Sequence, residues 1–152
     1  MTTLLGVSQK CQYALRAIFE LSQRYTSGAV ASVADVATVQ GIPPRFLEQI
    51  FTKLRTGNYI LSQRGNHGGY ILAKQPSDIS IGEIIRFIDG SESPIQCLNT
   101  PSGCKCPYPN SCVFKGLWQQ ASEATTKIFD LTTFQDLIDR QHTLSKTSDY
   151  TI

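Results

Sequence analysis

Residues 32–72 have the sequence SVADVATVQGIPPRFLEQIFTKLRTGNYILSQRGNHGGYIL, which contains the strongest signals for the fold class. Ser32 is a favourable N-cap, and Asp35 places a carboxylate in the first turn, where it complements the helix macrodipole. Gly41 ends this helix, because only glycine takes the left-handed conformation after a helix without steric cost. A short helix is therefore predicted between Ser32 and Gly41.

A second helix is predicted to follow over residues 44–56. Proline suits the first position of a helix, here Pro44, and Gly57 is the expected C-cap. The apolar side chains recur at the spacing of one buried face: Leu47, Ile50, Phe51 and Leu54. The outward positions are mostly polar: Arg45, Glu48, Gln49, Thr52, Lys53 and Arg55. Two short helices joined by a glycine turn are typical of a helix-turn-helix, although an ordinary αα-corner has the same pattern.

Two short β-prone runs, at 59–62 and 70–72, come directly after these helices. The residues between them, QRGNHGG, are rich in turn formers, so a hairpin is predicted. A hairpin in this place is a wing, and Arg64 at its tip suits a narrow minor groove, where the negative potential is strongest. The alternative is a hairpin with a merely solvated arginine, but the order of the elements favours DNA binding.

The charge distribution agrees with a nucleic-acid face in the first half of the chain. Residues 1–75 carry eight Lys/Arg against three Asp/Glu, which leaves +5, whereas residues 76–152 carry six against nine, which leaves −3. Such a basic half is typical of DNA-binding proteins, although solvated basic surfaces are common. No apolar run approaches the roughly 20 residues that cross a bilayer. The start of the chain has no secretory signal, so the protein is expected in the cytoplasm.

A capped helix opens the second half. The run Ser80-Ile81-Gly82-Glu83 has the capping-box pattern, in which each polar side chain bonds the backbone N–H of the other residue. Gly90 is the expected end of this helix, and its buried stripe is Ile81, Ile84, Ile85 and Ile88. Residues 91–112 lose the helical period and contain several prolines, so we expect an irregular loop.

A long amphipathic helix is predicted from Val113 to about Phe129. Its near-heptad stripe is Val113, Leu117, Ala121, Ala124 and Ile128. We interpret this helix as a dimer interface, with packing on its own domain as the alternative. A capping-box pattern at Thr132 opens a last helix, which should run to about Gln141.

The predicted fold class is mainly α with a small β wing: a winged helix-turn-helix plus a long dimerisation helix. The chain divides into a DNA-binding region at 1–75 and a region at 76–142, which holds the capped helix, the cysteine loop (91–112) and the dimerisation helices. A flexible tail is expected at 143–152.

Four of the five cysteines lie within one short segment: Cys97, Cys104, Cys106 and Cys112. In a reducing compartment, clustered cysteines are more often metal ligands or redox groups than structural disulfides. Four thiolates in a loop can surround an iron–sulfur cluster or a zinc ion, but the absence of C-x-x-C pairs makes a zinc ribbon the weaker interpretation. A thiol-switch regulator without a cofactor and a zinc-stabilised interaction module remain alternatives. No nucleophile–base pair or phosphate-cradling loop is present, so no enzyme is expected.

Several segments resemble the iron–sulfur winged-helix transcription regulators of the IscR/NsrR type. These are QKCQYALRA at 9–17, FLEQIFTKLR at 46–55, RGNHGGYIL at 64–72, the helix from Ser80 to Ile88, and Cys112 with Leu117-Trp118. The resemblance implies a homodimer on a palindromic operator, with helix 44–56 in the major groove and the wing in the minor groove. It also implies that Glu48 contacts bases, where a carboxylate can accept from cytosine N4. The expected DNA contacts are Arg45, Glu48, Gln49, Lys53, Arg64, Asn66 and His67.

The same resemblance implies an iron–sulfur cluster on Cys97, Cys104 and Cys112, with the 2Fe–2S type favoured and 4Fe–4S as the alternative. The fourth ligand is open, because the family's histidine position is Lys115 and its aspartate position is Gln12. The candidates are Cys106, Cys11 of the partner subunit, Gln12 of the partner subunit, or a small molecule. The resulting hypothesis is a transcription regulator that senses redox or iron–sulfur status.

Overall fold

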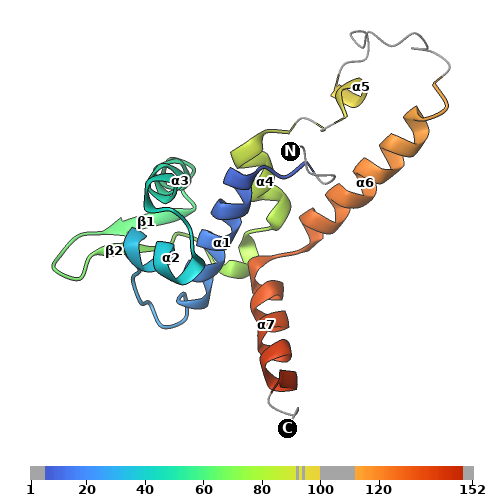
Figure 1. The fold of residues 1–152 in the computed structure, drawn as a ribbon. Coiled ribbons are helices and arrows are strands. Elements are labelled where there is room, and N and C mark those ends of the chain that lie inside the picture. The colour runs from blue at the N-terminus through green and yellow to red at the C-terminus, as the bar shows by residue number, and fades with distance from the viewer. Residues whose placement is uncertain (1–5, 92, 94, 100–111, 149–152) are drawn as a thin grey trace.

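The computed structural model of the chain describes residues 6–91, 93, 95–99 and 112–148. A body of short helices carries a two-stranded hairpin on one side, and a long helix leaves the body in another direction (Figure 1). Within these residues, no helix has both the length and the apolar character to cross a bilayer. The elements are, in chain order, α1 (Gln9–Gln23), α2 (Val33–Gln40), α3 (Pro44–Thr56), β1 (Ile60–Gln63), β2 (Gly69–Leu72), the 3-10 helix η1 (Pro76–Asp78), α4 (Ile81–Asp89), α5 (Gln96–Asn99), α6 (Lys115–Leu131) and α7 (Phe134–Ser148).

The helix-turn-helix, α2 and α3, begins and ends at the predicted residues. Ser32 Oγ accepts from Asp35 N at 3.1 Å, and the Asp35 carboxylate accepts from Ser32 N at 3.0 Å, which completes a capping box. Gly41 has φ +61°, the left-handed conformation that its position required. Pro44 opens α3, whose bounds agree with the prediction. These helix ends could be predicted from the sequence because each depends only on neighbouring residues.

One apolar core holds the helices together. Helix α1 buries Ala14, Ala17, Ile18 and Leu21, and α3 buries Leu47, Ile50, Phe51 and Leu54. Burying one large aliphatic or aromatic side chain stabilises the fold by about 1.5–3 kcal/mol relative to leaving it exposed. The same cluster includes Ile79, Ile84 and Phe134 from the second half of the chain. The region boundary expected near residue 75 therefore runs through a shared core.

The predicted wing is a hairpin joined to the body. β1 pairs antiparallel with β2, with Ile60 opposite Leu72. Tyr70 N donates to Ala31 O at 2.8 Å, and Ala31 N donates back to Tyr70 O at 3.1 Å. The Tyr70 ring also packs edge-on against Phe51, with ring centroids 4.7 Å apart. The hairpin is thus confirmed, and each strand begins one residue away from its predicted start.

Helix α4 has only half of its predicted capping box. Ser80 Oγ accepts from Glu83 N at 3.1 Å, as expected. The Glu83 carboxylate instead accepts from Tyr59 OH at 2.9 Å and lies 3.5 Å from Lys74 Nζ. The reciprocal half of the prediction was wrong, because side chains at the base of the wing compete for the same carboxylate.

The C-terminal helices also differ from the prediction. The short helix α5 lies inside the segment that was expected to be irregular throughout, and α6 runs two residues further than predicted. The cap of α7 is Thr133 rather than Thr132, since Thr133 Oγ1 accepts from Asp136 N at 3.2 Å. Helix α7 continues to Ser148, past the expected start of the tail at 143, because no glycine or proline interrupts it.

A methyl group at Gly69 would disturb the junction between wing and body. A Cβ there would lie 2.7 Å from the Ala31 carbonyl oxygen, which is backbone and accepts the Tyr70 N–H. We expect Gly69→Ala to lower the free energy of unfolding by about 1–3 kcal/mol, measured by urea denaturation. Gly116→Ala is the matched control, because a Cβ at Gly116 meets nothing within 4 Å. Equal stability of the Gly69→Ala variant and the wild type would contradict this packing.

Candidate nucleic-acid interface

Helix α3 presents a polar face away from the core. Arg45, Glu48 and Gln49 are all exposed, and their i, i+3, i+4 spacing puts them on one side of the helix. They occupy the first two turns, the part of a recognition helix that reaches base edges in helix-turn-helix proteins. A guanidinium, a carboxylate and an amide together offer the donors and acceptors that discriminate base pairs in a major groove.

Side chains of α1 form hydrogen bonds with the end of α2, next to the turn between α2 and α3. Arg16 donates to the backbone carbonyl of Gln40 and, through Nε, to its side-chain oxygen. Gln40 Nε2 donates to the buried Glu20 carboxylate at 3.1 Å, and Arg24 pairs with the same carboxylate at 2.8 Å. These contacts position the helix-turn-helix on α1. The sequence pattern did not reveal the contacts of Gln40 with Arg16 and Glu20, because they join residues 24 and 20 positions apart.

The wing loop carries the other predicted contacts. Arg64, Asn66 and His67 are exposed between β1 and β2, where the hairpin extends beyond the body (Figure 1). A Cβ at Gly68 would lie 2.6 Å from the Gln63 carbonyl oxygen, so this tight loop requires glycine there. An exposed arginine on such a hairpin suits a narrow minor groove.

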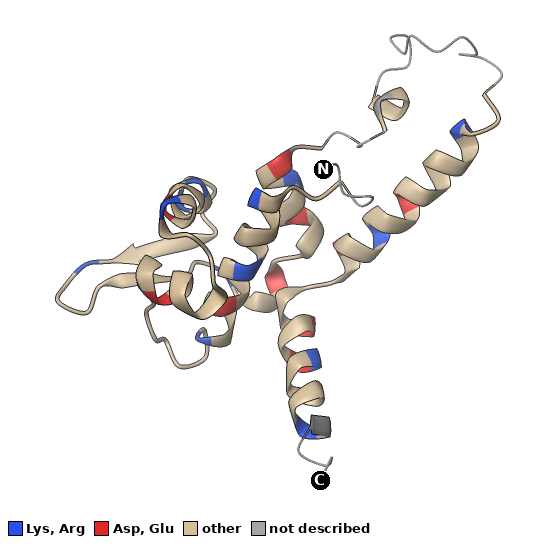
Figure 2. Ribbon diagram, viewed as in Figure 1, with Lys and Arg blue, Asp and Glu red and all other residues tan. Residues whose placement is uncertain are grey.

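Positive charge gathers on these two elements. Residues 44–68 contain four Lys/Arg and one Asp/Glu. In Figure 2, ribbon positions coloured for Lys and Arg lie on the wing loop and on α3. A surface of this sign attracts the phosphate backbone and releases its condensed counterions on binding.

Lys53 is placed differently from the other predicted DNA contacts. Its side chain is half-buried, and Nζ donates to the carbonyl oxygen of Ile88 at 2.9 Å. The same Nζ lies 5.5 Å from the centre of the Phe87 ring. The structure therefore directs this ammonium group to the end of α4, and it groups the other six residues on the outer surface.

Phe46 is an exposed residue that the sequence reasoning left unassigned. Its side chain is 58% exposed in the first turn of α3, between Arg45 and the buried Leu47. Phe46 lies one turn before Ile50, at the edge of the buried stripe, so the apolar spacing alone did not predict its exposure. An aromatic side chain in this place can contact the methyl group of thymine.

The described cysteines of the loop could contribute to a metal centre. Cys97 lies on α5 and Cys112 three residues before α6, and both are free, half-buried thiols. Soft thiolates of this kind are the ligands of iron–sulfur clusters and zinc. Cys104 and Cys106 lie outside the described residues, and within those residues no group of three metal-binding side chains occurs. The donor chemistry of Cys97 and Cys112 is compatible with such a cluster, and the third expected ligand, Cys104, is not among the described residues.

Cys11 and Gln12 were candidates for a ligand supplied by a partner subunit. Cys11 is fully buried in the core, where burial, followed by the nearby Asp89 carboxylate, raises the pKa of its thiol to about 12. Because the Cys11 side chain is packed inside the core, it is not accessible to a metal centre of a partner subunit in this conformation. Gln12 is exposed, and its Nε2 lies 3.4 Å from the Val7 carbonyl oxygen.

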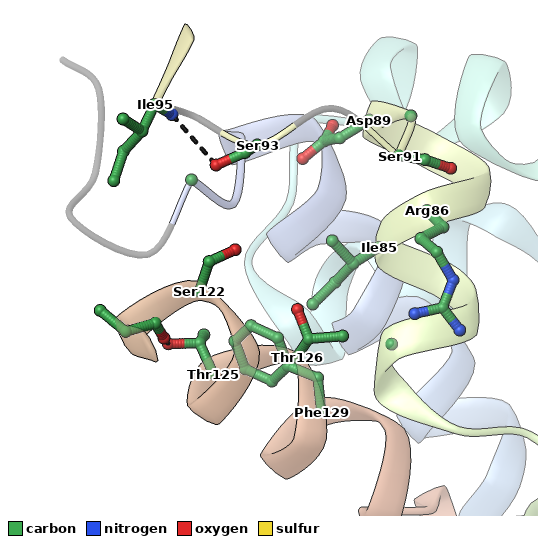
Figure 3. A pocket seen from close by; sticks show the side chains of 14 residues that line it. Ile85, Arg86, Asp89, Ser91, Ser93, Ile95, Ser122, Thr125, Thr126 and Phe129 are labelled. Atoms are coloured by element: carbon green, nitrogen blue, oxygen red, sulfur yellow. Dashed lines mark hydrogen bonds between the residues drawn. The ribbon is translucent and has the colours of Figure 1, made fainter. Parts of the chain in front are cut away.

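A cavity of about 290 Å³ lies between α4, the start of the cysteine segment and α6. Figure 3 shows Ile85 facing Thr126 and Phe129 across it, with Ser122 and Thr125 further along α6. Arg86 lines this cavity and forms an ion pair with Asp130 at 2.6 Å. The cavity therefore separates two helices that are joined at one end by an ion pair.

The sequence matches a known family over most of its length. A model of the Rrf2 family, described as an iron-dependent transcriptional regulator, matches residues 7–140. An Rrf2-like HTH-type transcriptional regulator of Rhodobacter capsulatus is 34% identical over 137 residues, which cover 87% of this chain and 91% of the relative. The HTH-type transcriptional regulator IscR of Escherichia coli O1:K1 / APEC is 31% identical over 140 residues, or 92% of this chain and 84% of the relative.

Solved structures agree with this match. The T. potens IscR structure has a TM-score of 0.72 at 30% identity, covering 89% of this chain and 87% of the other. The structure of CymR, the global cysteine regulator of B. subtilis, has a TM-score of 0.73 at 27% identity, covering 88% and 96%. These relatives are transcription regulators rather than enzymes. The fold, the helix-turn-helix with its wing and the sequence match together show that this chain belongs to the Rrf2 family of winged-helix transcription regulators.

Proposed function

We propose that the protein is a homodimeric regulator that binds a palindromic operator and senses redox or iron–sulfur status through its cysteine segment. The main support for DNA binding is the exposed face that Arg45, Glu48 and Gln49 form on α3. The wing loop is a second basic element. Helix α3 would lie in the major groove, and Arg64 would enter the adjacent minor groove. Asn66 and His67 would contact the backbone beside it.

Helix α6 supports the homodimer. None of its 17 residues is buried, although it contains a stripe of large apolar side chains. One face, with Thr125 and Phe129, lines the cavity against α4, whereas a different face remains exposed. That exposed face comprises Leu117, Ala124, Ile128 and Leu131. A second copy of α6 is the occupant that matches a self-complementary apolar helix face of this length.

The cysteine segment supports the sensing role. Cys97, Cys104 and Cys112 would hold an iron–sulfur cluster, and the fourth ligand would be Cys106, Gln12 of the partner subunit or a small molecule. The burial of Cys11 argues against Cys11 of the partner subunit in that role. When bound, such a cluster supplies a centre whose ligation depends on oxidants and iron supply. The 2Fe–2S type is the one that the family resemblance favours.

The chain itself connects this segment to the dimer. Cys112 lies three residues before α6, and Lys115 N donates to the Cys112 carbonyl at 3.3 Å. The conformation of the segment therefore influences where α6 begins. Because the dimer would set the distance between the two α3 helices, a small shift of α6 would change how well both fit their half-sites. Operator affinity would change accordingly.

Arg64 and Glu48 test the proposed DNA face. With an operator selected from random DNA, we expect Arg64→Ala to raise the Kd about tenfold, because it removes a minor-groove cation. Glu48→Ala should relax the preference for cytosine at one base pair, seen as similar Kd values for all four bases there. Arg140→Ala, which removes an exposed cation from α7, is the control and should bind like the wild type. Unchanged binding by both test variants would mean that the DNA face lies elsewhere.

The exposed face of α6 tests the dimer. Leu117→Glu places a carboxylate in the apolar stripe, and we expect it to yield monomers by sedimentation at micromolar concentration. Gln119→Glu adds the same charge on another side of the helix and should remain dimeric. A dimer that persists in the Leu117→Glu variant would exclude this face as the interface.

The cluster can be tested on protein purified without oxygen. We expect visible absorption with bound iron and sulfide in the wild type, and loss of all three signals in Cys104→Ala and Cys112→Ala. Cys11→Ala should retain them, because Cys11 is a core residue. A colourless wild type that forms a disulfide on oxidation would support the thiol switch instead, and zinc without DNA binding would support the interaction module.

A further inference from the structure

The end of α4 contacts both DNA-facing elements. Besides its contacts with Lys53, the Phe87 ring fills the space beside Gly57, where a Cβ would lie 2.5 Å from Phe87 Cζ. The ring centroid of Phe87 also lies 5.0 Å from that of Tyr59, the residue just before β1. Tyr59 OH in turn donates to Glu83 on the same helix. One side of α4 therefore supports the C-terminal end of α3 and the base of the wing together.

We propose that Lys53 is a positioning residue, which fixes α3 on the end of α4 and thereby sets its angle to the wing, rather than a phosphate ligand. This inference rests on the proposed DNA binding and replaces the role that the sequence suggested for this lysine. The carbonyl of Ile88 lies in the last turn of α4, where backbone oxygens lack helical partners and the macrodipole is negative. The Lys53 ammonium group donates to this carbonyl oxygen, and its positive charge complements the negative end of the macrodipole. The Phe87 ring beside it adds a cation–π contact.

The position of Lys53 along α3 agrees with this role. Lys53 follows Arg45 by eight residues, which is about 12 Å along the helix axis. It therefore lies near the end of α3 that is away from the base-reading turns. To reach a phosphate, its side chain would have to leave both Ile88 and Phe87. Arg55, on the same helix, is exposed and provides a comparison.

The two roles predict different binding data. A phosphate ligand contributes equally to operator and non-specific DNA, and its loss lowers the slope of log Kd against log salt concentration by about one. A positioning residue affects the fit of α3 and wing to a particular sequence. Its loss lowers the preference for the operator and leaves the salt slope unchanged.

The experiment measures Kd for a selected operator and for a random duplex at several salt concentrations, with the full-length protein. We expect Lys53→Met to lower the operator-to-random preference at least fivefold with a wild-type salt slope. Lys53→Arg, which can still donate to the Ile88 carbonyl, should recover most of the preference. Arg55→Met removes the same charge without the α4 contact and should keep the wild-type preference.

Phe87→Leu is a second variant, which keeps the charge of Lys53. It tests the contact between α3 and α4 if Lys53→Met does not fold. It should lower the preference in the same way, again without changing the salt slope. Parallel loss of both affinities with a reduced slope in Lys53→Met, or an unchanged preference in Phe87→Leu, would overturn the inference. A wild type that enriches no operator would instead contradict the proposed function, and the positioning role with it.

Discussion

Helix α1 is packed against α3, α4 and α7 at the same time, and the arrangement of the other elements depends on this packing. Polar contacts hold it near both ends. The Asp89 carboxylate accepts from Ser8 N at 2.8 Å and from Ser8 Oγ at 2.5 Å, and Arg16 and Glu20 hold Gln40 at the end of α2. Asp89 ends α4, two residues before the cysteine loop at 91–112, and Gln40 precedes the turn of the helix-turn-helix. Helix α1, about 22 Å long, therefore joins the two regions.

Helix α4 provides a second connection between the DNA-facing elements and the cysteine loop. It supports α3 through Lys53 and the wing through Tyr59, and its last residues lead into the cysteine segment. Helix α3 and the wing are both short, and each is fixed by contacts with α4. This arrangement suits a DNA-binding regulator, because α3 and the wing must fit the DNA surface at the same time.

The sequence predicted those features that depend on neighbouring residues. The cap at Ser32, the stop at Gly41 and the bounds of α3 were all local signals, and the apolar spacing identified the buried faces. The destinations of Glu83 and Lys53 were missed because both side chains bind residues more than 20 positions away. The same holds for the support of Gln40 by α1. Exposure of the α3 and wing residues followed from periodicity, but only the packed structure separates Lys53 from the outer face.

We infer that two copies of α3, held by one dimer, bind DNA together. Selection of bound duplexes from a random library by the wild-type protein, followed by sequencing, tests it most directly. We expect an inverted repeat whose half-site centres are separated by about one helical turn, roughly 34–36 Å, or a multiple of it. Enrichment of a single asymmetric site, or of no sequence at all, would contradict it.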